Sequence, residues 1–185
     1  MNSNKRILLL SGLFILVFLS RLIPHQPNFI AMSAGIIFSA GILGLPGLLS
    51  CILAYFSADL IVNHVIYGLP VSPNQYVTSF VFVYSCYMIN YLILRNQYRR
   101  KEIGALSIAQ MSLLSSILFF VVSNFGVWIN DALYPKTLTG LISCYTMAIP
   151  FFSYELAGTL FFSCVIFGSY FLVTRNRNSI NLQQI

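Results

Sequence analysis

The basic residues of this chain are confined to three places in the sequence. Eight of its ten Lys and Arg residues lie at the N-terminus, in one mid-chain segment and near the C-terminus: Lys5, Arg6, Arg95, Arg99, Arg100, Lys101, Arg175 and Arg177. Lys and Arg gather in the cytoplasmic loops of membrane proteins. If all three places are cytoplasmic, the chain crosses the bilayer an even number of times between them.

The composition indicates an integral membrane protein. The chain of 185 residues is 58% hydrophobic and 8% charged, too few polar residues to cover a water-soluble globule. Its length leaves room for five to seven crossings of about 20 residues each. The net charge of +6 lies in loop ends that meet anionic lipid headgroups. The basic residues are not interleaved with the aromatic platforms that single-stranded nucleic acid needs, so we expect no nucleic-acid partner.

The apolar runs predict an all-α bundle of six transmembrane helices in a single transmembrane domain, residues 1–185. Pro24 and Pro27 end the first run, and Gly44 and Pro46 mark a tight turn after the second. Six crossings place both termini in the cytoplasm and the protein in the bacterial cytoplasmic (inner) membrane. The expected spans are residues 7–22, 29–43, 48–65, 76–94, 105–122 and 155–172.

Residues 123–154 interrupt this pattern but are too apolar for an ordinary solvated loop. The run 137–148 has helical character, is flanked by Pro135 and Pro150, and is too short to span a bilayer. We expect a re-entrant or interfacial helix between spans five and six.

Small residues recur at four-residue intervals in the second span, at Ala31, Gly35 and Ser39. Such a stripe allows the backbone of another helix to come close, either in this chain or in a partner. We predict that it forms a partner-docking surface.

Asp59 is the acidic residue that lies deepest inside an apolar run, and Asn63 follows it one helical turn later. A charge at membrane depth is costly and faces the bundle interior or a water-filled cavity. It therefore marks a binding site, or alternatively forms an ion pair with Arg21 that organises the bundle.

Further polar and aromatic residues fall on the non-cytoplasmic side, in segments 21–28, 68–75 and 123–150, which we expect to roof a pocket. Glu155 and Lys136 lie on the same side. Trp128 can stack on a flat ligand or belong to an interfacial aromatic belt. The predicted substrate-binding residues are Arg21, His25, Asn28, Asp59, Asn63, Asn124, Trp128 and Tyr134.

An enzyme is not expected. The sequence has no nucleophile and base pair, no paired catalytic carboxylates and no phosphate-binding glycine loop. It has no Walker-type motif, so the chain does not hydrolyse ATP alone. The four cysteines have no metal-ligand spacing and are interpreted as packing thiols, so we expect no cofactor and no metal.

Four segments carry a resemblance to a family of uncharacterised bacterial membrane proteins labelled as transport proteins. They are residues 21–29 (RLIPHQPNF), 123–128 (SNFGVW), 134–145 (YPKTLTGLISCY) and 148–152 (AIPFF). More distantly, the GLPG turn at 44–47 followed by SADL at 57–60 is similar to the S components of energy-coupling factor (ECF) vitamin transporters. In those proteins the small-residue stripe is expected on the first helix, whereas here it is on the second.

This resemblance implies a substrate-binding membrane component of a vitamin-like uptake transporter. Such a component binds a small organic molecule in an outward-facing pocket, contacts membrane lipid, and docks a transmembrane coupling subunit and ATPases. The alternatives are a structural or assembly subunit without its own ligand, and a self-sufficient channel or exporter. A polar cavity bordered by Asp59 and Trp128 would favour the binding protein, and a close-packed interior with these residues facing outward would count against it.

Overall fold

The computed structural model describes residues 2–69, 73–99, 103–130 and 132–182, and these form helices and connecting loops with no β-strand among them. The α-helices are α1 (Ser3–Leu22), α2 (Met32–Phe38), α3 (Leu45–Leu60), α4 (Pro73–Tyr98), α5 (Ala105–Asn130) and α6 (Leu138–Leu182). α2 and α3 continue directly as wider π-helical turns, η1 (Ser39–Leu43) and η2 (Ile61–Ile66). The all-α class predicted from the sequence is confirmed.

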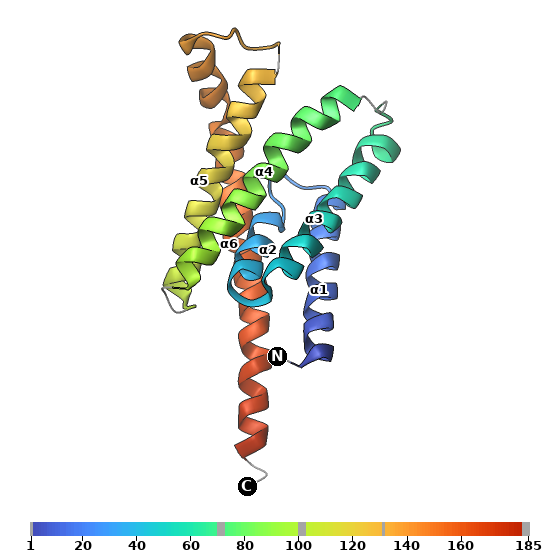
Figure 1. Cartoon of the computed structure of the whole chain (residues 1–185), viewed down its shortest axis with the longest axis vertical. Coiled ribbons are helices and arrows are strands. Elements are labelled where there is room, and N and C mark those ends of the chain that lie inside the picture. Colours follow the sequence, from blue (N-terminus) through green and yellow to red (C-terminus); the bar gives the residue numbers. More distant parts are fainter. Residues whose placement is uncertain (1, 70–72, 100–102, 131, 183–185) are drawn as a thin grey trace.

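The helices run alternately in opposite directions (Figure 1). The start of α1, the end of α4 with the start of α5, and the end of α6 all lie toward one end of the molecule (Figure 1). We call this the basic end, because Lys5 and Arg6 lie near the start of α1, Arg95 near the end of α4, and Arg175 and Arg177 near the end of α6. Among the described residues, four α-helices lie between the first and second basic segments and two between the second and third, and the even numbers of membrane crossings stay a prediction.

Three helices are long and apolar enough to cross a membrane, in agreement with a membrane protein: Leu45–Ile66, Ala105–Asn130 and Leu138–Thr174. The expected second span is shorter than predicted. α2 and η1 together cover Met32–Leu43, about 18 Å at 1.5 Å per residue, against a hydrocarbon core of about 30 Å. The described residues thus hold three helices of spanning length, and the six-span bundle expected from the sequence stays a prediction.

α2 occupies the centre of the protein. All seven of its residues are buried, and it packs against α1, α3, α4, α5 and α6. A helix that is apolar on every side is stable only when other elements surround it. Its shortness follows from the same position, because it starts and ends inside the bundle.

The small-residue stripe on this helix faces neighbouring helices of the same chain. Ala31, Gly35 and Ser39 are buried, and a Cβ on Gly35 would lie 2.8 Å from Cys51 Sγ and 3.3 Å from Val17 Cγ2. The stripe thus brings α1 and α3 close to α2 and has no free surface for a partner. This corrects the predicted docking role.

The predicted re-entrant helix and the predicted sixth span are one helix. α6 has 45 residues, runs without a break through Pro150 and is about 67 Å long, and α5 continues to Asn130, beyond its expected end at residue 122. The prediction was wrong because a proline removes only one helical donor, and because the polar residues after Pro150 are accommodated inside the helix. Ser153 donates to the carbonyl of Pro150, and Glu155 is buried against other helices.

The turn between η1 and α3 depends on Gly44, whose φ of 71° is a conformation that favours glycine. Next to it, Arg95 Nη1 donates to the carbonyl of Ala40 at 3.3 Å. A cation at the carbonyl end of a helix is favourable, so this basic residue stabilises the end of the central helix.

We predict that Gly35→Ala lowers the stability of the folded protein, because the added methyl group is forced against Cys51 and Val17. Overpacking of this kind costs about 1–3 kcal/mol. Gly12→Ala in α1 is the matched control, since a Cβ there meets nothing within 4 Å. Thermal unfolding in detergent should show a lower midpoint for Gly35→Ala than for Gly12→Ala. Equal midpoints would contradict the close packing described for Gly35.

Candidate functional site

The loop between α1 and α2, residues 23–31, enters the interior of the bundle. It is non-helical, as Pro24 and Pro27 predict, and the backbone N–H of Ala31 donates to Ser20 Oγ at 3.0 Å. The loop passes so close to α6 that a Cβ on Gly158 would lie 3.0 Å from the Cα of Phe29. This path places Asn28, which has a φ of 64°, beside α5 and α6.

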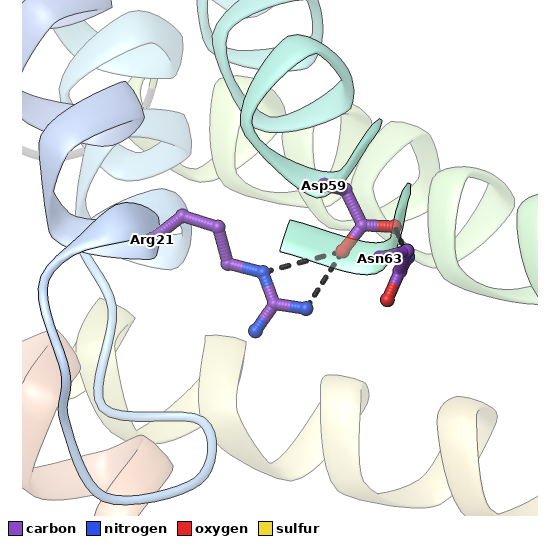
Figure 2. Close-up of polar contacts among 3 residues, drawn as sticks. All are labelled: Arg21, Asp59 and Asn63. Carbon is purple, nitrogen blue, oxygen red and sulfur yellow. Dashed lines mark hydrogen bonds and ion pairs between the residues drawn. The ribbon is translucent and has the colours of Figure 1, made fainter. Parts of the chain in front are cut away.

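Arg21 and Asp59 form an ion pair between α1 and α3 (Figure 2). Arg21 donates to Asp59 Oδ1 from Nη2 at 2.7 Å and from Nε at 3.2 Å. The other carboxylate oxygen, Oδ2, accepts from Asn63 Nδ2 at 3.0 Å. The Arg21 guanidinium also lies 5.6 Å from the centre of the Tyr55 ring, within the range of a cation–π contact.

Both oxygens of Asp59 therefore have partners from within the chain. Each side chain of the ion pair is about one quarter exposed, at 25% and 24%. Of the two roles considered for Asp59, the structure has the second, an ion pair that ties α1 to α3. Arg21, Asp59 and Asn63 lie together as predicted, but they do not line the cavity described next.

A cavity of about 170 Å³ lies between the 23–31 loop, α5 and α6. Its wall combines four polar residues with four phenylalanines and a valine. The lining residues are Asn28, Phe119, Phe120, Ser123, Asn124, Val127, Phe151, Phe152 and Glu155. Two of the predicted site residues, Asn28 and Asn124, are thus brought together from segments almost a hundred positions apart.

Glu155 is the charged residue of this cavity, and the sequence-based site did not include it. Its side chain is only 3% exposed. Ser33 Oγ donates to Oε1 at 2.6 Å, and Thr159 Oγ1 donates to the same oxygen at 3.2 Å. Within the described part of the chain, no hydrogen bond to Oε2 and no cation paired with this carboxyl is found.

The signal that would have found Glu155 is the one that selected Asp59, an acidic residue inside an apolar helix. A charge near the centre of a bilayer costs about 2.5–3.5 kcal/mol on insertion scales, so it needs compensation or a function. Residues 123–154 were interpreted as a membrane-interrupting segment, which placed Glu155 at the start of a span. In the structure it lies well inside α6.

The remaining predicted site residues lie elsewhere. His25 Nδ1 is 2.6 Å from the carbonyl oxygen of Gln26. Trp128 Nε1 donates to the carbonyl of Pro135 at 3.1 Å, and Lys136 Nζ donates to the carbonyls of Trp128 and Tyr134. Trp128 and Tyr134 therefore order the connection between α5 and α6 and do not line the cavity. Part of the predicted roof, residues 70–72, lies outside the described residues.

A larger hollow of about 550 Å³ lies toward the basic end, between α1 and α6. Its wall is formed largely by apolar residues of these two helices and by Phe38. Lys5 lies at its margin, with Nζ 5.7 Å from the centre of the Tyr170 ring. It has few polar groups with which to orient a polar ligand, so the smaller cavity at Glu155 is the better candidate site.

Residues 1–181 match the model of a protein family, DUF6580, described as a family of unknown function. The chain belongs to this family. No curated protein and no solved structure matches it. The match to DUF6580 covers almost the whole chain, but no activity is known for this family. Any function has to be inferred from the residues of the site.

We predict that Asp59→Asn destabilises the protein, because it leaves the partly buried Arg21 without its counter-charge. Arg21→Gln should be destabilising for the same reason. The double variant should lose less than the sum of the two single losses, with a coupling of about 0.5–3 kcal/mol, the range for contacting pairs. Thermal unfolding of the four proteins in the same detergent measures this cycle. Additive losses would mean that the ion pair contributes nothing to stability.

Proposed function

We propose that this chain is the substrate-binding membrane component of a small-molecule uptake transporter, and that the cavity at Glu155 is its binding site. The observation that carries the proposal is the environment of the Glu155 carboxyl group. It is buried in an apolar protein, one oxygen is held by two hydroxyl groups, and it lies in the wall of a polar and aromatic cavity. A carboxyl whose only role was structural would be expected to have both oxygens engaged, as Asp59 has.

The proposed setting is the bacterial cytoplasmic membrane, with the basic end and both termini in the cytoplasm. α5 starts at the basic end, and the cavity residues 119–127 belong to its second half. The cavity then lies in the outer half of the bilayer, where a ligand enters from outside. α2 is too short to cross the membrane by itself, so in this arrangement the 23–31 loop and α2 together bring the chain back to the basic end.

The polar contacts of the cavity are suited to recognition and not to chemistry. It holds one carboxyl, two amides and a hydroxyl, without a nucleophile and base pair in its wall. Binding alone does no work against a gradient, since a ligand shifts an equilibrium only by its differential affinity. Uptake therefore requires partners, and the resemblance to ECF S components suggests a coupling subunit with ATPases for that role.

The size of the cavity limits the range of possible substrates. At about 170 Å³ it is smaller than the roughly 300–1,000 Å³ of sites for drug-sized ligands. The proposed ligand is therefore a compact molecule, smaller than the vitamins bound by ECF S components.

We predict that Asn124→Leu removes a bound small molecule from the purified protein. Asn130→Leu is the matched control, because the two asparagines lie on the same helix and make the same local bond. Asn124 Nδ2 donates to the Phe120 carbonyl at 2.7 Å, and Asn130 Nδ2 donates to the Gly126 carbonyl at 2.9 Å. Only Asn124 lines the cavity.

Native mass spectrometry of the wild type and both variants provides the measurement. The wild type and Asn130→Leu should carry the same small molecule, and Asn124→Leu should carry about tenfold less. If none of the three proteins carries a small molecule, and no compound from a metabolite library raises the unfolding temperature of the wild type, the binding role is refuted. A structural or assembly subunit then becomes the better description.

A further inference from the structure

We infer that the ligand of this cavity is a small organic cation, an ammonium compound whose charge pairs with Glu155. This inference rests on the proposed function and adds the chemical class of the substrate. It depends on three features of the described residues: the missing counter-charge, the direction in which the polar groups are used, and the aromatic wall.

The first feature is charge. The ion pair found among the described residues joins Arg21 to Asp59, and Glu155 has no such partner there. The cavity residues that surround Glu155 are Asn28, Ser123, Asn124, a valine and four phenylalanines. None of these carries a positive charge in any protonation state. A cationic ligand would supply the charge that the chain itself does not.

The second feature is that two side chains of the cavity donate within the chain while their acceptor oxygens stay open. The amide nitrogen of Asn124 donates to the Phe120 carbonyl, and the hydroxyl of Ser123 donates to the Phe119 carbonyl. Ser123 then keeps only acceptor capacity, and Asn124 keeps its amide oxygen and one of its two N–H groups. Glu155 adds Oε2, because Ser33 and Thr159 both donate to Oε1. These open acceptor oxygens can receive the N–H groups of a primary ammonium ion such as methylammonium, and their partial negative charge also favours a quaternary cation.

The hydroxyl groups also orient the carboxyl. Ser33 comes from α2 and Thr159 from the next turn of α6, so Oε1 is held from two helices. One turn further along α6, Ser163 lies 3.3 Å from Ser112 of α5, oxygen to oxygen. This column of buried hydroxyl groups keeps α2, α5 and α6 in register beneath the cavity. The free oxygen of Glu155 is thereby presented by a rigid support.

The third feature, the aromatic wall of the cavity, favours an organic cation over a metal ion. Phe119, Phe120, Phe151 and Phe152 line the cavity, and the rings of Phe120 and Phe152 are 5.3 Å apart at an angle of 61°. Hard metal ions require about six oxygen ligands, which this wall does not provide. Aromatic faces combined with one carboxylate are instead the surroundings that favour alkylammonium groups.

The test measures binding of small ammonium ions and of their neutral isosteres by isothermal titration calorimetry on the full-length protein in detergent. The probes are methylammonium, tetramethylammonium and choline, and the neutral isostere of choline is dimethylbutanol. We expect at least one ammonium ion to bind, and choline to bind about tenfold or more tightly than dimethylbutanol. Glu155→Gln keeps the shape of the side chain and removes its charge, so it should lower the affinity for that ammonium ion by about tenfold or more.

Asp59→Asn is the control, because it removes the other carboxylate within the helices and should leave ammonium binding within about twofold. If Glu155→Gln does not fold, the comparison of each ammonium ion with its neutral isostere on the wild type decides the question alone. An outcome in which no ammonium ion binds more tightly than its isostere overturns the inference. The proposed function survives that outcome if a neutral or anionic molecule co-purifies with the wild type and is lost in Asn124→Leu.

Discussion

The complete burial of α2 is the constraint on which the rest of this structure depends. The other five helices all pack against this short helix, and its backbone can be approached closely because Gly35 has no side chain between Cys51 and Val17. Since α2 begins inside the bundle, the preceding loop has to enter the bundle as well. That loop then meets α6 at Gly158 and carries Asn28 into the wall of the cavity. The candidate site is therefore a consequence of where the central helix begins.

Among the described residues, two acidic side chains lie within apolar helices, and their surroundings differ. Asp59 pairs with Arg21 and accepts a hydrogen bond from Asn63, so groups of the same chain compensate for the burial of its charge. Glu155 receives only hydroxyl groups, and both of them use the same oxygen. An ionised carboxylate in these surroundings is unfavourable unless a cation pairs with it. This contrast between the two carboxyls is what supports a binding role, and it is visible only when hydrogen bonds are assigned atom by atom.

Several features could be predicted from the sequence because they depend on local composition. The helical class, the break at Pro24 and Pro27, and the turn at Gly44 follow from hydropathy and from the backbone preferences of proline and glycine. The association of Arg21, Asp59 and Asn63 was also predictable, since charges in apolar helices have to find one another. Asn28 and Asn124, which the sequence analysis selected as site residues, both lie in the wall of the candidate cavity. None of these inferences required knowledge of which helix lies beside which.

The sequence by itself thus determined that the chain is helical, suited to a membrane, and ordered so that its three basic segments gather at one end. These properties follow from the free energy of placing each side chain in an apolar surrounding, which is a local quantity. Only the tertiary structure decided that the Ala31, Gly35 and Ser39 stripe faces α1 and α3, that α6 continues through Pro150, and that Glu155 joins Asn28 and Asn124. Each of these depends on which groups meet across helices. Hydropathy averaged along the chain carries no information about these contacts between helices, because it does not specify the direction in which a side chain points.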